Sequence, residues 1–480
     1  MIVSLIRLVS ALLVIVSATM LLPTGVAIYY SEVEMIPAFL EPIIFCFIIA
    51  IVIRLFTRNN KFKLNPRTGF TTVALCWIFS SILGAMPLMI SGYIPHFADA
   101  LFESASGFTT TGATILPEIT SLPRSFNLWR MQMHWLGGMG IVALTVALLP
   151  LLGVGGFQLI KAETTGPEKG KITPKITNTA KILWMTYGAF TIIQTILLML
   201  AGMDFVDALG HTFATLGTGG FSSQNTSVGA YNSAAIDWIC TIFMFLAGVN
   251  FSLYYMILTG RGKNVLKNTE LKVYVGILAI ATFVVTIIIY PLYGTVWNSI
   301  RYSAFQVSSI MTTTGFSTAN FNAWPEAAKM VLFILMFIGG CSGSTGGSIK
   351  VIRWVVVAKQ LTNETKRMLH PHGIFTIHLN GRAGRKDIVY NVAAFFFLYF
   401  LFVMFTAFIA SLNGADLITS LTASLALVGN IGPGFAGVGP MENYSFFSNA
   451  AKYWFSFAMI AGRLELYTMI MFFVPAYWKR

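Results

Sequence analysis

The sequence predicts an all-α integral membrane protein: two N-terminal helices, then four pseudo-symmetric repeats of a span, a short half-length helix, a glycine turn and a second span. Two observations support this fold class. The 480 residues are 56% hydrophobic and 10% charged, whereas about 25% of residues are charged in soluble domains. Four similar glycine-centred turns recur along the chain, which indicates an internal repeat.

Ten apolar segments approach the ~20 residues needed to cross a bilayer. The first carries Arg7 and lacks a small-residue cleavage site before an evident mature domain, so we interpret it as a retained helix rather than a signal peptide. The ten segments are 3–30, 36–56, 69–93, 130–160, 180–202, 235–260, 271–293, 327–358, 388–412 and 450–477. They predict N-terminal helices at 1–66 and repeats at 67–162, 163–262, 263–360 and 361–480, the last with a long basic loop.

The net charge of +13 follows the expected membrane topology. Basic residues gather in alternate loops, and the opposite loops carry mostly Asp and Glu. By the positive-inside rule, both termini are then cytoplasmic. The charge therefore does not indicate nucleic-acid binding. The basic groups lie within 54–67, 161–181, 261–272, 350–386 and 479–480.

The cysteines and loop histidines predict no metal site. All four cysteines lie in or beside apolar segments without close spacing, which favours buried free thiols. Three histidines in the long basic loop lack a cysteine or carboxylate constellation and are interpreted as solvated. These residues are Cys46, Cys76, Cys240, Cys341, His370, His372 and His378.

The candidate functional residues lie in the four glycine-centred turns. They read TTTGAT at 109–114, LGTGGFS at 216–222, TTTGFST at 312–318 and GNIGPG at 429–434, with central glycines at 112, 219, 315 and 432. Non-helical backbone at membrane depth persists where it lines a watery cavity or is buried in protein. Uncharged backbone carbonyls on a central axis could replace water around a partly dehydrated cation. One such turn alone would be an ordinary loop, but four at matched positions favour an ion-selectivity filter around one pore. Its predicted residues are Thr110, Thr111, Gly112, Leu216, Thr218, Gly219, Thr313, Thr314, Gly315, Asn430, Ile431 and Gly432.

A short helix is expected before each turn. Asp99, Asp207 and Asp416 place an acid at the positive end of the first, second and fourth of these helices, and Asn298-Ser299 leads the third. Glu103 lies within the first short helix, where a helix-terminal carboxylate or a buried network partner is favoured over an ion ligand.

Two further features are unusual for apolar spans. The Gly/Ser/Thr run at 339–347 cannot hold a regular helix, because each glycine costs about 1 kcal/mol relative to alanine, so a broken helix that faces the pore is favoured. Close packing of small residues is the alternative. Arg463 lies inside the last apolar span, where a charge is costly. A structural pair with Glu465 is the alternative role, although residues two apart face different sides of a helix. The residues of these two features are Gly339, Gly340, Gly343, Gly346, Gly347 and Arg463, and the family resemblance described next implies that they form a gate.

With these motifs the whole chain resembles the superfamily of K⁺ transporters that includes bacterial TrkH and KtrB and the fungal and plant Trk and HKT proteins. The two leading helices, the run at 339–350 and Gly462-Arg463-Leu464-Glu465 resemble the TrkH branch. The resemblance implies a K⁺ pore, a gating loop beneath the filter and a pore-facing Arg463. It also implies a homodimer regulated by TrkA-type cytosolic nucleotide-binding subunits. Potassium would contact Thr110, Thr111, Thr218, Thr313, Thr314, Asn430 and Ile431.

The expected function is therefore K⁺ uptake through a channel-like pore in a bacterial inner membrane, in contact with lipid, without enzymatic activity or an organic cofactor. Each turn has one shared glycine, unlike ordinary K⁺ channels, which predicts weaker selectivity for K⁺ over Na⁺. A coupled secondary carrier, moving K⁺ with H⁺ or Na⁺, remains an alternative because carriers also contain broken helices. A scaffold subunit with a vestigial pore is a third possibility.

Overall fold

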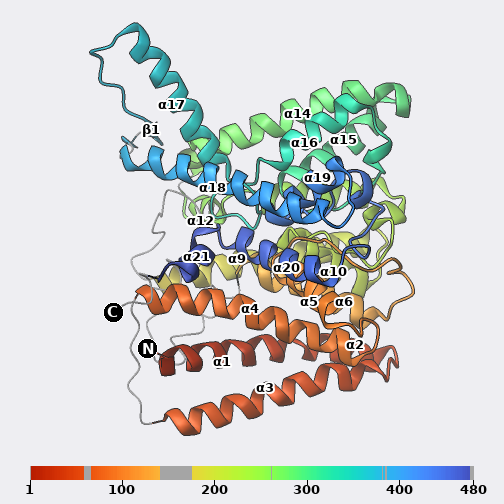
Figure 1. The fold of residues 1–480 in the computed structure, drawn as a ribbon. Helices are drawn as coiled ribbons and strands as arrows, with labels where there is room; N and C mark the ends of the chain where they lie inside the picture. Colours follow the sequence, from red (N-terminus) through yellow and green to blue (C-terminus); the bar gives the residue numbers. More distant parts are fainter. Residues whose placement is uncertain are drawn as a thin grey trace.

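The computed structural model describes residues 2–58, 66–140, 176–260, 262–380, 382–383 and 386–475, and these residues form a helical bundle (Figure 1). The all-α prediction is confirmed. Within the described ranges the sheet is a two-stranded hairpin of β1 (His378–Leu379) and β2 (Arg382–Ala383). The predicted domain boundaries stay predictions, and part of the first two repeats, with the basic residues at 61–63 and 161–175, lies outside the described residues.

Two N-terminal spans precede the first repeat. The first consists of α1 (Ile2–Thr19) and α2 (Leu21–Tyr29), and the second is α3 (Met35–Thr57). In Figure 1, α1 and α3 lie beside α4 (Pro66–Ile90) along one side of the bundle. The outer face of α3 exposes large apolar residues such as Ile44 and Phe45, as expected for a surface in contact with lipid.

The same order of elements recurs in four parts of the chain. A long helix is followed by a short helix, a turn and a second helix. The first part contains α4, α5 (Phe97–Phe108) and α6 (Arg124–Gly138). The second contains α9 (Ile176–Leu200), α10 (Phe205–Gly217), η2 (Ser227–Tyr231), α11 (Ala234–Ala247), α12 (Phe251–Leu258) and α13 (Gly262–Leu266). The third contains α14 (Thr269–Tyr293), α15 (Val296–Met311), η3 (Phe321–Ala323), α16 (Glu326–Met336) and α17 (Val351–Leu369). The fourth contains α18 (Lys386–Ser411), α19 (Leu417–Val428), η4 (Ala436–Val438), α20 (Asn449–Arg463), α21 (Tyr467–Ile470) and η5 (Met471–Phe473).

Several predicted spans are single long helices, and others are broken. In the described part, six helical segments are long and apolar enough to cross a membrane. The predicted span 235–260 is instead split into α11 and α12, which meet at 91°, and 450–477 is split after α20 by a bend of 116°. These two predicted spans are therefore broken helices. The second half of the predicted span 130–160 lies outside the described residues.

The short helices begin slightly differently from the prediction. Asp416 caps α19 as expected, through bonds from the amides of Ile418 and Thr419. In the second repeat the cap is Asp204 and not Asp207. In the third it is Thr295, which accepts from the amide of Asn298, so Asn298 lies inside the first turn. Asp99, in the first turn of α5, forms an ion pair with Lys452 of α20 at 2.6 Å.

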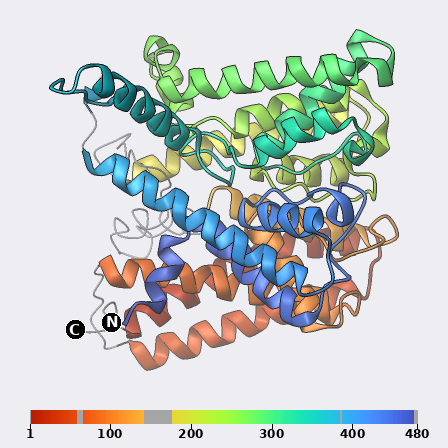
Figure 2. The same ribbon diagram turned by 45° about the horizontal axis from the view of Figure 1, so that its top comes forward.

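One part of the structure stands apart from the bundle. Figures 1 and 2 show α17 projecting beyond it, with β1 nearby in Figure 1, between the third and fourth repeats. His370, His372 and His378 are exposed in this region, in agreement with their interpretation as loop histidines. The four cysteines are free and buried, as predicted.

Candidate functional site

Each short helix ends in the same turn. Two backbone amides after the helix bond back to carbonyls of its last turn, for example Thr110 N to Gly107 O at 3.1 Å and Thr111 N to Ser106 O at 2.9 Å. One residue in each turn adopts the left-handed conformation, with φ of 54–59°. Threonine rarely adopts this conformation, and such strain concentrates at functional sites. The left-handed residues are Thr110, Thr218, Thr313 and Asn430.

Two residues further along, each turn has a glycine with φ between 78° and 96°. These glycines are Gly112, Gly220, Gly315 and Gly432. In the second turn the equivalent glycine is thus Gly220, one residue later than the predicted Gly219. Gly219 instead lies against the ring of His134, where an added methyl group would overlap the imidazole. Leu216 belongs to the last turn of α10, so it lies before the turn rather than in it.

The four turns contact one another in a closed ring. A methyl group on any of the four glycines would overlap a backbone carbonyl oxygen of the next turn. Gly112 faces the carbonyl of Gly219, and Gly220 faces that of Thr314. Gly315 faces the carbonyl of Ile431, and Gly432 faces that of Thr111. The order runs from the first turn to the fourth and back to the first, and it places four equivalent carbonyls around one axis.

A small cavity adjoins this ring. Its volume is about 100 Å³, and all four glycines line it together with Arg130, Glu442 and residues of the loops above the turns. A ring of carbonyl oxygens next to a water-sized cavity can replace part of the hydration shell of a cation.

The ring is held by hydrogen bonds between buried side chains. Thr109 and Thr111 share a bond of 2.8 Å between their hydroxyls, and Thr312 and Thr314 share one of 2.7 Å. Asn430 connects the fourth turn to the first, because its Nδ2 donates to Thr111 Oγ1 at 3.0 Å. The turns are therefore tied to one another as well as to their own helices.

A buried ion pair supports the first two turns. Arg130 pairs with Glu103 at 2.6 Å, and both side chains are fully buried. Glu103 also accepts from the Thr114 hydroxyl and from the amide of Ile115 at 3.0 Å. The Arg130 guanidinium lies over the Phe221 ring, 4.2 Å from its centre. Glu103 is therefore a network partner, as expected.

His134 was not recognised in the sequence. Its Nδ1 lies 2.7 Å from the carbonyl of Gly107, and its Nε2 lies 3.2 Å from the amide nitrogen of Phe221. Because the Phe221 amide must donate, Nε2 is the acceptor and the ring is neutral with its proton on Nδ1. The imidazole thus connects the end of α5 to the second turn. A lone histidine in an apolar segment gives no signal for such a role.

The predicted break in the third repeat is real and longer than expected. The backbone is non-helical from 337 to 350, between α16 and α17. We call 337–350 the glycine loop. Its backbone bonds to the α11–α12 break, through Cys341 N to Gly248 O at 2.8 Å and Phe251 N to Gly343 O at 3.0 Å. Glu270 of α14 accepts from the amides of Ser342 at 2.7 Å and Ile352 at 3.1 Å.

Two basic side chains, one from α20 and one from the loop itself, bond to carbonyls of the glycine loop. Arg463 donates to the carbonyl of Thr345 at 2.6 Å and to those of Gly137 and Gly138 at 2.9 and 3.0 Å. The last two carbonyls close α6, where the negative end of the helix dipole favours a cation. Lys350, which is buried, donates to the carbonyl of Gly346. Glu465 accepts from Arg353 at 2.6 Å.

Several buried or half-buried acids near these elements are paired with bases. Besides Glu103 and Arg130, the ion pairs are Asp99–Lys452, Asp237–Arg301 and Glu465–Arg353. At the exposed cap of α19, hydrogen bonds from the Thr419 side chain and from backbone amides lower the pKa of Asp416.

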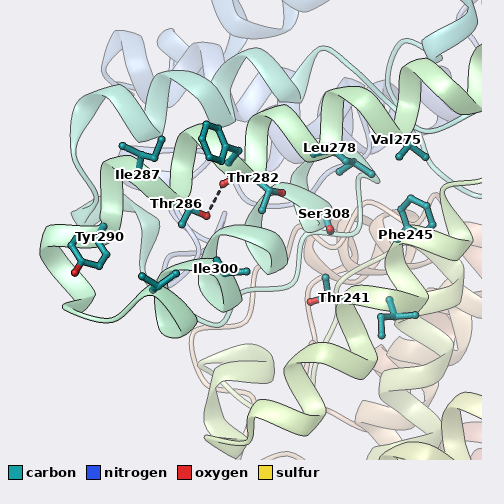
Figure 3. A pocket seen from close by; sticks show the side chains of 14 residues that line it. Thr241, Phe245, Val275, Leu278, Thr282, Thr286, Ile287, Tyr290, Ile300 and Ser308 are labelled. Atoms are coloured by element: carbon teal, nitrogen blue, oxygen red, sulfur yellow. Dashed lines mark hydrogen bonds between the residues drawn. The ribbon is translucent and has the colours of Figure 1, made fainter.

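A larger groove lies away from the ring. It has a volume of about 850 Å³ and is lined by apolar residues of α11, α14 and α15 (Figure 3). The hydroxyls of Thr241 and Thr286 bond to carbonyls of their own helices. The walls are mostly apolar, with the hydroxyls of Thr241, Thr282, Thr286, Tyr290 and Ser308, and they include no residue of the four turns.

Comparison with known proteins gives consistent matches. Residues 35–480 match the TrkH family, described as cation transport protein. The chain is 36% identical to the Trk system potassium uptake protein TrkH of Escherichia coli K12 over 479 residues, covering 98% of each chain. It is 37% identical to TrkH of Halomonas elongata, covering 99% of this chain and 98% of the relative. The crystal structure of the potassium transporter TrkH from Vibrio parahaemolyticus matches with a TM-score of 0.87 at 33% identity, with full coverage of both chains.

Proposed function

We propose that this chain, which belongs to the TrkH family of cation transport proteins, carries K⁺ into the cell across a bacterial inner membrane. K⁺ would pass through a channel-like pore, whose selectivity filter consists of the four glycine turns. The glycine loop and Arg463 would close the pathway below the filter.

One observation carries this proposal: the closed ring in which each turn places a glycine against a carbonyl of the next. A carbonyl cage selects a cation through the number and placement of its oxygens, and close packing of the turns fixes both. We propose backbone carbonyls as the ligands of the ion. They are the carbonyls of Thr111, Gly219, Thr314 and Ile431, beside the left-handed residues Thr110, Thr218, Thr313 and Asn430.

We propose the partners from the relatives. The TrkH proteins of E. coli and H. elongata are named as parts of a Trk system. A TrkA-type cytosolic subunit is therefore the expected regulator, and two copies of this chain are expected to form a homodimer surrounded by lipid. Both termini and α17 would lie on the cytoplasmic side, in agreement with the basic residues of 350–386.

The proposed function can be tested in cells that lack their own K⁺ uptake. Expression of this chain should restore growth at low K⁺, and K⁺ uptake should increase further with a TrkA-type partner. Recordings from the purified protein in bilayers would separate the alternatives. Unitary currents indicate a pore, a fixed coupling ratio to H⁺ or Na⁺ indicates a carrier, and the absence of any flux would contradict both.

Shortening the glycine loop by deletion of residues 343–346 is expected to increase K⁺ flux. The deletion removes a plug, and a roughly tenfold increase would correspond to a barrier lowered by ~1.4 kcal/mol. The measurement is K⁺ uptake per copy of protein in the membrane, with and without the partner. Unchanged flux in a well-expressed variant would show that the loop is not a gate.

Removal of positive charges from the basic segment 350–386 is expected to weaken docking of the regulator. Glutamine at Lys366, Arg367, Arg382 and Arg385 should reduce affinity by about tenfold, because each ion pair at the rim of a protein interface contributes ~0.2–1 kcal/mol. Binding would be measured by pull-down of a TrkA-type ring. Glutamine at Lys263 and Lys267, basic residues outside this region, is the control. If both variants bind as tightly as the original protein, the basic residues serve topology alone.

A further inference from the structure

The glycine loop bonds directly to two of the glycine turns. The amide of Gly347 donates to Thr313 Oγ1 at 2.6 Å, and the amide of Ser348 donates to the carbonyl of Gly429 at 2.9 Å. The packing is close, since a methyl group on Gly347 would overlap that same carbonyl. The loop therefore contacts the third and fourth turns through specific hydrogen bonds as well as through close packing.

These bonds break the fourfold similarity of the turns. The hydroxyl of Thr313 accepts from the loop, whereas that of Thr218 donates to the carbonyl of Gly217. The hydroxyl of Thr110 is buried without a hydrogen-bond partner among the described residues. Asn430, at the fourth position, bonds to Thr111 and to the carbonyl of Met459. The four turns have equivalent backbones, but the side chain at the left-handed position is hydrogen-bonded differently in each. In the third turn its partner is the glycine loop.

The far side of the loop is held by elements outside the turns. Glu270 of α14 accepts from the loop amide of Ser342 and from the amide of Ile352 in the first turn of α17, and Arg463 of α20 donates to the Thr345 carbonyl of the loop. A change that moves α14 or α20 would therefore pull on the loop. Through Gly347 and Ser348 it would also reach the carbonyls of the turns.

We propose that the glycine loop is a structural support of the ion-selective ring as well as a plug, so that its withdrawal lowers selectivity for K⁺ over Na⁺ while it increases flux. This rests on the proposed filter. Thr313 acts as a positioning residue, because its hydroxyl fixes a strained left-handed turn whose carbonyls form the cage. Without the two loop bonds the third and fourth turns gain freedom, and a looser cage discriminates less between ions.

Matched variants can test the proposal. Thr313→Val removes the hydroxyl that accepts from Gly347 and keeps the branched shape. Thr110→Val removes the equivalent hydroxyl where no loop bond exists. Since each variant takes one hydroxyl from the ring, the difference between them isolates the loop bond. We expect the K⁺/Na⁺ permeability ratio to be about fivefold lower in Thr313→Val than in Thr110→Val, the factor for one hydrogen bond of ~1 kcal/mol. Thr313→Ser should restore the ratio.

The outcomes separate this inference from the proposed function. Equal shifts in both valine variants would leave the filter in place and overturn the role of the loop. Unchanged ratios in both variants, with normal flux, would likewise overturn the role of the loop, whereas the filter itself is contradicted only if Gly315→Ser, which disturbs a carbonyl of the ring, also leaves the ratio unchanged.

A second variant covers the case in which Thr313→Val does not reach the membrane. The deletion of 343–346 should increase flux and lower the permeability ratio together. An increase in flux with an unchanged ratio would show a plug alone and would overturn the proposal.

Discussion

Gly315→Ser is expected to lower the K⁺/Na⁺ permeability ratio by roughly tenfold or more, which corresponds to ~1.4 kcal/mol of lost discrimination. The glycine has φ of 83°, and a methyl group there would overlap the carbonyl oxygen of Ile431. Serine would therefore have to displace one of the four carbonyls of the ring. We expect loss of discrimination first and loss of flux where the turn cannot accommodate the change. The ratio is measured from reversal potentials under mixed K⁺ and Na⁺.

Gly414→Ser provides a matched control. Gly414 also has φ of 83°, but an added methyl group would meet nothing within 4 Å. Both serines incur the cost of a left-handed side chain, ~1–2 kcal/mol, and Gly315→Ser alone disturbs the ring. Normal selectivity and uptake in Gly315→Ser, or equal losses in both variants, would contradict the filter. Replacement of Gly220 should resemble that of Gly315, because Gly220 faces the carbonyl of Thr314.

The features that could be predicted from the sequence depend on local composition. Thr-Thr-Thr-Gly after a short apolar helix forms its turn through bonds within a few residues, so its recurrence was visible without a structure. The break at 337–350 was visible for the same reason, since the density of glycine excludes a helix. The choice between Gly219 and Gly220 could not be made, because two adjacent glycines satisfy the pattern equally. Only the backbone angles and the neighbouring turn distinguish them.

The supports of the ring could not be predicted, because they join residues far apart in the sequence. His134 connects Gly107 to Phe221, and Arg463 reaches carbonyls of the first and third repeats. One missed feature did carry a signal: the α11–α12 break occurs at Gly248-Val249-Asn250, and Asn250 caps α12. A glycine followed by a capping residue inside an apolar run marks a possible helix end.

Arg463→Ala is expected to increase K⁺ flux, through two effects that act in the same direction. A fixed positive charge opposes a passing cation by about 4 kcal/mol at ~4 Å with an effective dielectric constant near 20. The guanidinium also ties the glycine loop to the end of α6 through Thr345, Gly137 and Gly138. Alanine removes both the charge and the tie. Uptake per copy of protein should therefore rise by tenfold or more, a change of ~1.4 kcal/mol in the barrier.

Arg463→Lys separates the two effects, because lysine keeps the charge and loses the planar fork that binds several carbonyls at once. If charge dominates, the lysine variant keeps the low flux of the original protein, and if the tie dominates, it approaches the alanine variant. The alternative role, a structural pair with Glu465, makes the opposite prediction. Alanine would then orphan a carboxylate and reduce uptake, and Glu465→Ala would restore it. Because Glu465 already accepts from Arg353 at 2.6 Å, we expect no such rescue, and uptake that falls in the single variant and returns in the double would overturn the role of Arg463 as a barrier.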